Sequence, residues 1–120
     1  MSTPKRILIV DDESRDISLL QAILDSEGYE TRSAASGFEA LGRLDSSIDL
    51  VLLDILMPGM DGLRATKAIR EKGFDSIPII AMTANAMTGD REKCIDAGMN
   101  DYISKPIRRE NVLEVIHKWI

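Results

Sequence analysis

Short apolar stretches alternate with longer amphipathic stretches along the chain. Five stretches rich in β-branched and other apolar residues have the length of strands, at residues 6–10, 30–34, 50–54, 77–82 and 101–104. Five amphipathic stretches have the length and spacing of helices, at residues 14–26, 37–44, 63–72, 89–97 and 109–120. Strands that alternate with helices predict parallel strands joined by crossover helices, so we expect an α/β fold.

The first and third strand stretches are continuously apolar, which is typical of parallel strands covered by helices on both faces. Because crossover connections are right-handed, we predict a doubly wound sheet with the strand order 2-1-3-4-5. Ligands of such sheets bind beyond the carboxyl ends of the strands, where the strand order reverses. In this chain that point lies between the first and third strands.

Local signals support these boundaries. Ser36 and Glu39 have the spacing of a capping box, and Asp61 is placed to cap the third helix through its side-chain oxygen. Each predicted helix that precedes the second, fourth or fifth strand is followed by a glycine, which ends a helix in the left-handed conformation without a Cβ clash. These glycines are Gly28, Gly73 and Gly98.

Carboxylates follow the first and third strands. Asp11 and Asp12 come directly after the first apolar stretch, and Asp54 ends the third and opens a turn-rich segment that runs to Gly62. Acids on neighbouring strand ends repel one another unless a cation lies between them, and an oxygen-rich site suits Mg²⁺. The sequence therefore predicts a magnesium site at this edge.

A hydroxyl and an ammonium group stand at two further strand ends, at Thr83 and Lys105. Acid, metal, hydroxyl and lysine together indicate a phosphoryl site. Each feature also has an ordinary explanation: acids favour helix N-termini, Pro, Gly and Asp form turns, and single Thr or Lys residues are usually surface residues. Their shared position at strand ends favours the functional interpretation.

The composition is that of an ordinary globular protein. The 120 residues, 44% hydrophobic and 29% charged, predict a single domain over residues 1–120. A net charge of -5 argues against a nucleic-acid surface. No apolar stretch reaches the length of a membrane span and no signal peptide precedes the first strand, so we expect a cytoplasmic location without membrane contact. The single cysteine, Cys94, excludes an internal disulfide and is interpreted as a structural thiol.

Four spaced signals in this order resemble the receiver domain of two-component response regulators, over essentially the whole chain. The signals are Asp11-Asp12, then Asp54 leading Met57-Pro58-Gly59-Met60-Asp61-Gly62, then Thr83-Ala84, and finally Lys105-Pro106. Residues 82–87 and 99–102 are most similar to receivers of hybrid sensor histidine kinases or phosphorelays. The resemblance implies a flavodoxin-like (βα)5 fold and a phosphoacceptor signalling domain that catalyses only its own phosphorylation and dephosphorylation.

The resemblance also implies roles for single residues. Asp54 would accept a phosphoryl group from a phosphohistidine of a histidine kinase or a histidine phosphotransfer protein. Asp12, Asp54 and the backbone carbonyl of Leu56 would bind Mg²⁺, with Asp11 acting mainly through water. Lys105 would contact the phosphoryl oxygens as a point charge.

Thr83 and Tyr102 are the implied switch residues. The Thr83 hydroxyl would bond a phosphoryl oxygen after the loop behind the fourth strand moves inward, and Tyr102 would rotate into the vacated space. This would reshape the surface of the fourth helix, fifth strand and fifth helix. The resemblance further implies a cis peptide bond between Lys105 and Pro106.

Two other protein classes share parts of this pattern. A phosphatase or phosphotransferase with an aspartyl nucleophile would share Asp54, Thr83, Lys105 and Mg²⁺, but would normally need an acid at the position of Leu56. A flavodoxin-like cofactor binder would need a phosphate-cradling loop of Gly, Ser and Thr after the first strand, where this chain has residues 11–13, Asp-Asp-Glu. Turnover of a phosphomonoester or a bound flavin would revive these alternatives.

Other residues are interpreted as lying outside the chemistry. Met82, Met87 and Met99 are expected to pack in the core or in loops, and His117 is expected to be a surface or packing residue rather than a phosphotransfer histidine. Many relatives carry a polar side chain at the position of Leu56, so we expect slow loss of phosphate here.

Partner docking is expected on the rim of the site. The rim residues are Ser14, Arg15, Asp16 and Leu19, with Leu19 alternatively a core residue, together with Pro106 and Ile107. Because nothing follows Ile120 in this sequence, it leaves open whether the chain is a free-standing receiver or part of a larger kinase or regulator.

Overall fold

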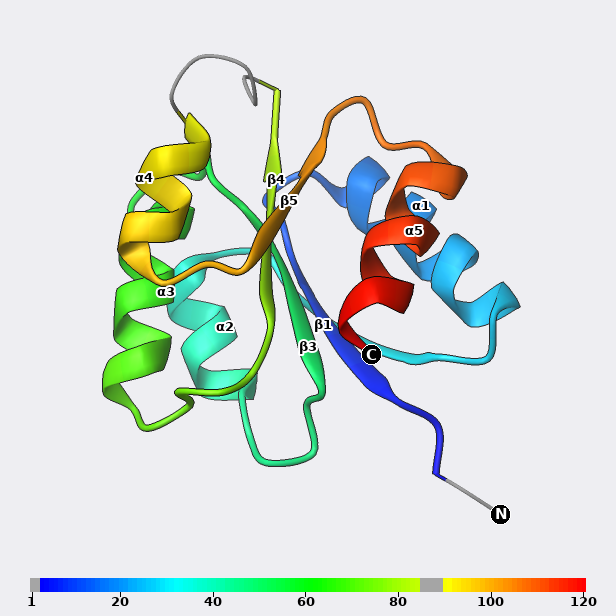
Figure 1. Cartoon of the computed structure of the whole chain (residues 1–120), viewed down its shortest axis with the longest axis horizontal. Coiled ribbons are helices and arrows are strands. Elements are labelled where there is room, and N and C mark those ends of the chain that lie inside the picture. Colours follow the sequence, from blue (N-terminus) through cyan, green and yellow to red (C-terminus); the bar gives the residue numbers. More distant parts are fainter. Residues whose placement is uncertain (1–2, 85–89) are drawn as a thin grey trace.

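The computed structural model describes residues 3–84 and 90–120. In these residues five parallel strands form one sheet with the order β2-β1-β3-β4-β5 (Figure 1). The strands are β1 (Arg6–Val10), β2 (Glu30–Ala34), β3 (Leu50–Asp54), β4 (Ile79–Thr83) and β5 (Asp101–Ser104). The predicted flavodoxin-like α/β fold and its strand order are confirmed.

Helices cover both faces of the sheet (Figure 1). Helices α1 (Ser14–Ser26) and α5 (Arg109–Trp119) lie on one face, and α2 (Gly37–Arg43), α3 (Gly62–Glu71) and α4 (Asp90–Ala97) lie on the other. In the part of the chain that the structure describes, no helix is long and apolar enough to cross a membrane.

Most element boundaries agree with the sequence prediction, and β4 differs most. We expected this strand over residues 77–82, but it runs from Ile79 to Thr83. Pro78 has no N–H to donate to a neighbouring strand, and the carbonyl of Ile77 accepts a hydrogen bond from Arg70 instead. Helix α3 starts and ends one residue earlier than predicted, and α2 and α5 each end one residue earlier. The predicted first residue of α4, residue 89, lies outside the described residues.

The core consists of two apolar layers, one on each face of the central strands. Alternate side chains of β1, β3 and β4 point to opposite faces, and almost all of them are fully buried. Met82 and Met99 belong to these layers, as does the buried thiol of Cys94, in agreement with their predicted packing roles. Met87 lies outside the described residues.

Caps fix where the helices begin and end. Ser36 Oγ accepts a hydrogen bond from the backbone N–H of Glu39 at 3.1 Å, while the Glu39 carboxylate pairs with Arg43 at 2.8 Å. Asp61 caps α3 by accepting from the N–H of Arg64 at 2.9 Å. The three glycines predicted to end helices have φ angles of 86°, 101° and 107°, so their left-handed conformation is confirmed; they are Gly28, Gly73 and Gly98.

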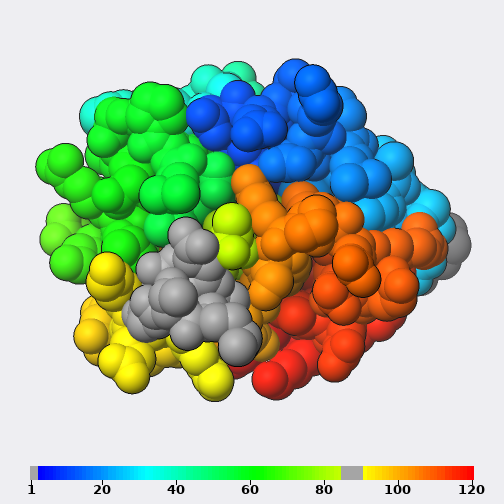
Figure 2. Space-filling view, turned by 90° about the horizontal axis from the view of Figure 1, so that it is seen from above, coloured from blue at the N-terminus to red at the C-terminus, as the bar shows by residue number. Residues whose placement is uncertain are grey.

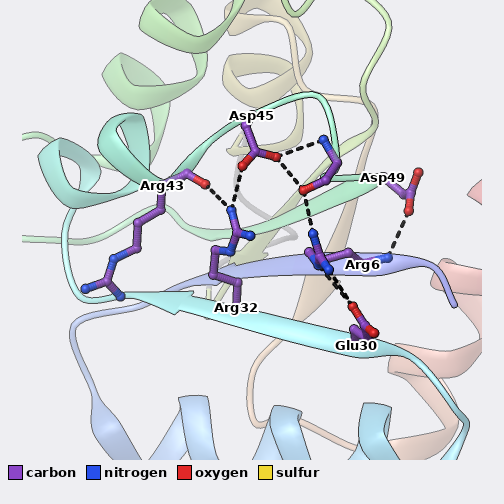
Figure 3. Close-up of polar contacts among 7 residues, drawn as sticks. Arg6, Glu30, Arg32, Arg43, Asp45 and Asp49 are labelled. Atoms are coloured by element: carbon purple, nitrogen blue, oxygen red, sulfur yellow. Dashed lines mark hydrogen bonds and ion pairs between the residues drawn. The ribbon is translucent and has the colours of Figure 1, made fainter. Parts of the chain in front are cut away.

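A polar network ties the loop between α2 and β3 to the amino-terminal end of the sheet (Figure 3). The Arg6 backbone N–H donates to Asp49 at 2.8 Å, and its guanidinium donates to Glu30 at 2.7 Å. Arg32 of β2 donates to Asp45 at 3.0 Å. Hydrogen bonds from Ser47 and then from Arg32 lower the pKa of Asp45 to about 2. The network lies at the strand ends opposite to the predicted site.

Candidate active site

The segments that follow β1, β3, β4 and β5 meet at the carboxyl edge of the sheet. Figure 2 looks onto this edge and shows the blue, green, yellow-green and orange segments converging. Asp54 and Thr83 are the last residues of β3 and β4, while Asp11 follows β1 and Lys105 follows β5. The parallel sheet therefore brings residues that are far apart in sequence to one place, as predicted.

Three acids form a cluster with the spacing of a cation site. One carboxylate oxygen each of Asp11, Asp12 and Asp54 lies within 4.8 Å of the others. Asp11 and Asp54 are buried, and Asp12 is exposed. Oxygens on opposite sides of a Mg²⁺ ion are about 4.2 Å apart, because each Mg–O bond is about 2.1 Å long. A three-carboxylate donor set at this spacing fits a hard divalent cation.

Lys105 reaches into the cluster from the strand on the far side of β4. Its Nζ lies 3.0 Å from Asp16, 3.1 Å from Asp11 and 3.4 Å from Asp54. The sequence indicated Lys105 as a site residue, but placed Asp16 only on the docking rim. Asp16 is the third residue of α1, so its place in the first helical turn after the Asp11-Asp12 segment was the available signal that it lies near this edge.

Burial dominates the electrostatics of Asp54. Burial, and next the negative charge of Asp11, raise the pKa of Asp54 to about 6, although Lys105 acts in the opposite direction. Burial also raises the pKa of Asp11, against the backbone N–H of Glu13, which donates to it at 2.9 Å. Without a divalent cation, burial therefore disfavours the charged forms of Asp11 and Asp54.

Burial would lower the pKa of Lys105, but its neighbours outweigh this effect. Hydrogen bonds to Asp16 and Asp11 and the charges of Asp11 and Asp54 raise the pKa of the lysine. The ammonium therefore stays charged at neutral pH. It is the one cation that the described residues place within bonding distance of the buried acids.

A pocket of about 230 Å³ is lined by several of the predicted site residues. Thr83, 6% exposed, lines it at the end of β4, and Leu56, 71% exposed, lies at its rim. The backbone carbonyl of Thr83 accepts a hydrogen bond from the N–H of Lys105 at 2.8 Å, which ties the β4 and β5 ends together. The pocket is also lined by Asp12, Glu13, Asp54, Met82, Ala84 and Lys105.

Tyr102 lies outside this pocket. It lines a neighbouring groove of about 360 Å³ over β5, between α4 and α5, with Asp101 and Ser104. The guanidinium of Arg91 lies 5.6 Å from the centre of the Tyr102 ring. The predicted switch tyrosine therefore belongs to the predicted α4-β5-α5 surface and not to the acidic pocket.

Three further predictions concern the Lys105–Pro106 bond, Leu19 and His117. The Lys105–Pro106 peptide bond is cis, as expected. Leu19 is 44% exposed on α1, so the alternative that it is a core residue is wrong. His117 is exposed, with its ring centre 6.5 Å from that of Tyr29, in agreement with a surface or packing role.

Comparisons with known proteins agree with this architecture. The family model of the response regulator receiver domain matches residues 7–117. The chain is 39% identical over 98% of its length to the sensor protein GacS of Pseudomonas syringae pv. syringae, and 41% identical over 95% of its length to hybrid signal transduction histidine kinase L of Dictyostelium discoideum. It spans only 14% and 7% of these relatives.

Solved structures have the same fold. The receiver domain of sensor histidine kinase PA1611 from Pseudomonas aeruginosa PAO1 is 38% identical, with a TM-score of 0.88 over 98% of both chains, and was solved with a magnesium ion coordinated in the active site cleft. The chemotaxis protein CheY4 of Vibrio cholerae is 26% identical, with a TM-score of 0.94 over 98% of this chain and 100% of that chain.

The chain belongs to the response regulator receiver domain family. It is a signalling domain of the two-component class, and the predicted similarity to receivers of hybrid sensor histidine kinases is confirmed.

Proposed function

We propose that residues 1–120 form a single receiver domain in which Asp54 accepts a phosphoryl group. One observation carries the proposal: the buried Asp54 carboxylate lies within 4.8 Å of oxygens of Asp11 and Asp12 and 3.4 Å from Lys105 Nζ. A nucleophile, an acidic cation site and a fixed positive charge therefore share one pocket, which is the set of groups that phosphoryl transfer requires.

In the proposed reaction a carboxylate oxygen of Asp54 forms a bond to phosphorus. The phosphorus–nitrogen bond of the donor phosphohistidine breaks, and its electron pair leaves with the imidazole. Asp12, Asp54 and the backbone carbonyl of Leu56 are the proposed Mg²⁺ ligands, with Asp11 acting through water. When bound, Mg²⁺ offsets the negative charge of the transferring group.

Lys105 and Thr83 are the proposed partners of the phosphoryl oxygens. Lys105 fits this role because its ammonium lies 3.4 Å from the Asp54 carboxylate. Thr83 supports it because its side chain lines the same pocket from the end of β4. A hydrogen bond from the Thr83 hydroxyl to the new group would pull the β4 end inward. Tyr102, next to this end on β5, would then turn inward and change the α4-β5-α5 surface.

We infer that the donor is a histidine kinase or a histidine phosphotransfer protein, because the relatives are sensor kinases. The proposed domain catalyses only its own phosphorylation and dephosphorylation. An aspartyl-nucleophile phosphatase is disfavoured because Leu56, two residues after Asp54, offers no acid. A cytoplasmic location, without contact to membrane or nucleic acid, stays a prediction of the sequence.

The test is to incubate the chain with acetyl phosphate and Mg²⁺ and to measure its intact mass. The native chain is expected to gain one phosphoryl group, and Asp54→Asn to gain none. Asp96→Asn is a matched control, because Asp96 is an exposed acid on α4 outside the cluster, and it is expected to behave as the native chain. Equal labelling of Asp54→Asn, or none of the native chain with any activated donor, would refute the proposal.

A further inference from the structure

We propose that Asp16 is a positioning residue that holds Lys105 in place when a divalent cation occupies the acidic cluster. The inference rests on the proposed function and assigns to α1 a part in the site that the family signals do not include. Asp16 acts through the lysine and is not itself a proposed metal ligand or phosphoryl contact.

Asp16 differs from the other acidic partners of Lys105 in two ways: it is the nearest, and it lies outside the cation cluster. Its carboxylate is the nearest of three, at 3.0 Å from Nζ, against 3.1 Å for Asp11 and 3.4 Å for Asp54. Asp11 and Asp54 belong to the cation cluster, whereas Asp16 does not. Its side chain is 23% exposed and that of Lys105 is 20% exposed, so the pair is partly shielded from water.

Charge explains why this third acid matters. A divalent cation in the cluster engages the carboxylates of Asp11 and Asp54 and at the same time repels the nearby ammonium. Of the three acids that contact Lys105, only Asp16 then keeps its full charge for the lysine. It offsets the repulsion and prevents Lys105 from competing with the cation for Asp11 and Asp54. Lys105 has three N–H donors, so it can keep this contact and still donate to a phosphoryl oxygen.

A double-mutant cycle distinguishes the proposed role of Asp16 from two simpler roles. If Asp16 acts through Lys105, its effect disappears when the lysine is replaced. If Asp16 only adds negative charge near the cation, its effect persists without the lysine. If it only ties α1 to the end of β5, its loss changes stability and leaves cation binding unchanged.

The experiment measures Mg²⁺ dissociation constants by calorimetry for the native chain, Asp16→Asn, Lys105→Met and the double variant. We expect Asp16→Asn to weaken Mg²⁺ binding by about three- to tenfold, as for loss of a partly buried charged hydrogen bond. In the Lys105→Met background the same change should alter binding by about twofold or less. Asp16→Glu, which keeps the carboxylate, should recover part of the affinity. Asp25→Asn is the control, an exposed acid on the same helix far from Lys105.

The second measurement is the rate of phosphorylation by acetyl phosphate, for those variants that can still be phosphorylated. Asp16→Asn is expected to react about three- to tenfold more slowly than the native chain at limiting Mg²⁺, with urea unfolding close to native. Equal losses of Mg²⁺ affinity in both backgrounds, or native affinity and rate in Asp16→Asn, would overturn the inference alone. A native chain that neither binds Mg²⁺ nor accepts phosphate would overturn the proposed function, and the inference with it.

Discussion

A Cβ atom on Gly62 would lie 2.4 Å from the backbone carbonyl oxygen of Asp54 and 2.8 Å from the Cα of Ile55. The turn that carries the acceptor therefore closes directly on the first residue of α3. The Gly62 N–H donates to the Ile55 carbonyl at 2.9 Å, which fixes this close approach. No side chain fits between α3 and the end of β3, so glycine is required for packing at this position.

Gly62→Ala is expected to destabilise the fold by about 1–3 kcal/mol, because the added methyl must push the α3 start away from the Asp54 backbone. Gly42→Ala is the matched control: nothing lies within 4 Å of its Cβ position, inside α2, so this change is expected to stabilise by about 0.5–1 kcal/mol. Urea unfolding of both variants checks the prediction. Equal stability of the two would contradict it.

Arg70 connects α3 with the ends of α4 and β4. Its guanidinium donates to the carbonyls of Phe74 and Ile77 at 2.7 Å each, to Gly98 and to the Asn100 side chain. Arg70→Lys is expected to lower the free energy of unfolding by about 2–4 kcal/mol, because one ammonium cannot donate to all of these acceptors and leaves carbonyls unpaired.

Arg64→Lys provides the control for that loss. Arg64 is an exposed residue of the same helix, and its replacement is expected to change stability by about 0.5 kcal/mol or less. Thermal or urea unfolding distinguishes the two variants. A similar, small effect at both positions would show that the Arg70 contacts contribute little.

Asp54 is expected to make the metal-free protein less stable at neutral pH. Its pKa is raised to about 6 from an ordinary value of 3.8, so the folded state holds a proton that the unfolded chain releases. The resulting stabilisation is complete below about pH 4 and is lost as the pH rises through about 6.

Asp54→Asn should therefore be more stable than the native chain by roughly 1–3 kcal/mol at about pH 7.5 in a chelator, and the difference should shrink at about pH 4. Urea unfolding at the two pH values measures this. Saturating Mg²⁺ should stabilise the native chain and leave the variant almost unchanged. A stability difference independent of pH would be at odds with the raised pKa.

Leu56 is expected to prolong the life of the phosphoryl group. Its side chain is 71% exposed at the rim of the pocket and offers no hydrogen bond to an attacking water. Leu56→Gln should speed dephosphorylation by about three- to tenfold, because an amide can orient that water. Leu56→Met keeps the side chain apolar and should leave the rate near native. Loss of phosphate followed by intact mass gives both rates, and a Gln variant no faster than native would disprove the idea.

The sequence predicts the sheet and most of the site because both depend on simple geometry. Continuous apolar stretches identify β1 and β3 as covered strands, and parallel strands carry their carboxyl ends to one edge. For that reason Asp11, Asp12, Asp54, Thr83 and Lys105 come together as expected.

Contacts that depend on how far a side chain reaches could not be predicted in this way. The bond between Asp16 and Lys105 joins residues 89 positions apart and depends on the distance between α1 and the end of β5. Tyr102 lines a separate groove because its ring leaves the sheet on the α4 side, which strand periodicity does not define. The start of β4 differs from the prediction because Pro78 has no N–H for the sheet and the Arg70 guanidinium, reaching over from α3, binds the carbonyl of Ile77.

Two arginine side chains beside β2 also protect an exposed edge of the sheet. Strand β2 ends the sheet on one side, and an uncovered border strand recruits strands of other molecules and starts aggregation. Arg32 of this strand is paired with Asp45, and the guanidinium of Arg43 donates to the backbone carbonyl of Ser33. Charged groups therefore occupy positions that a sixth strand would need, which favours a chain that stays dispersed at high concentration.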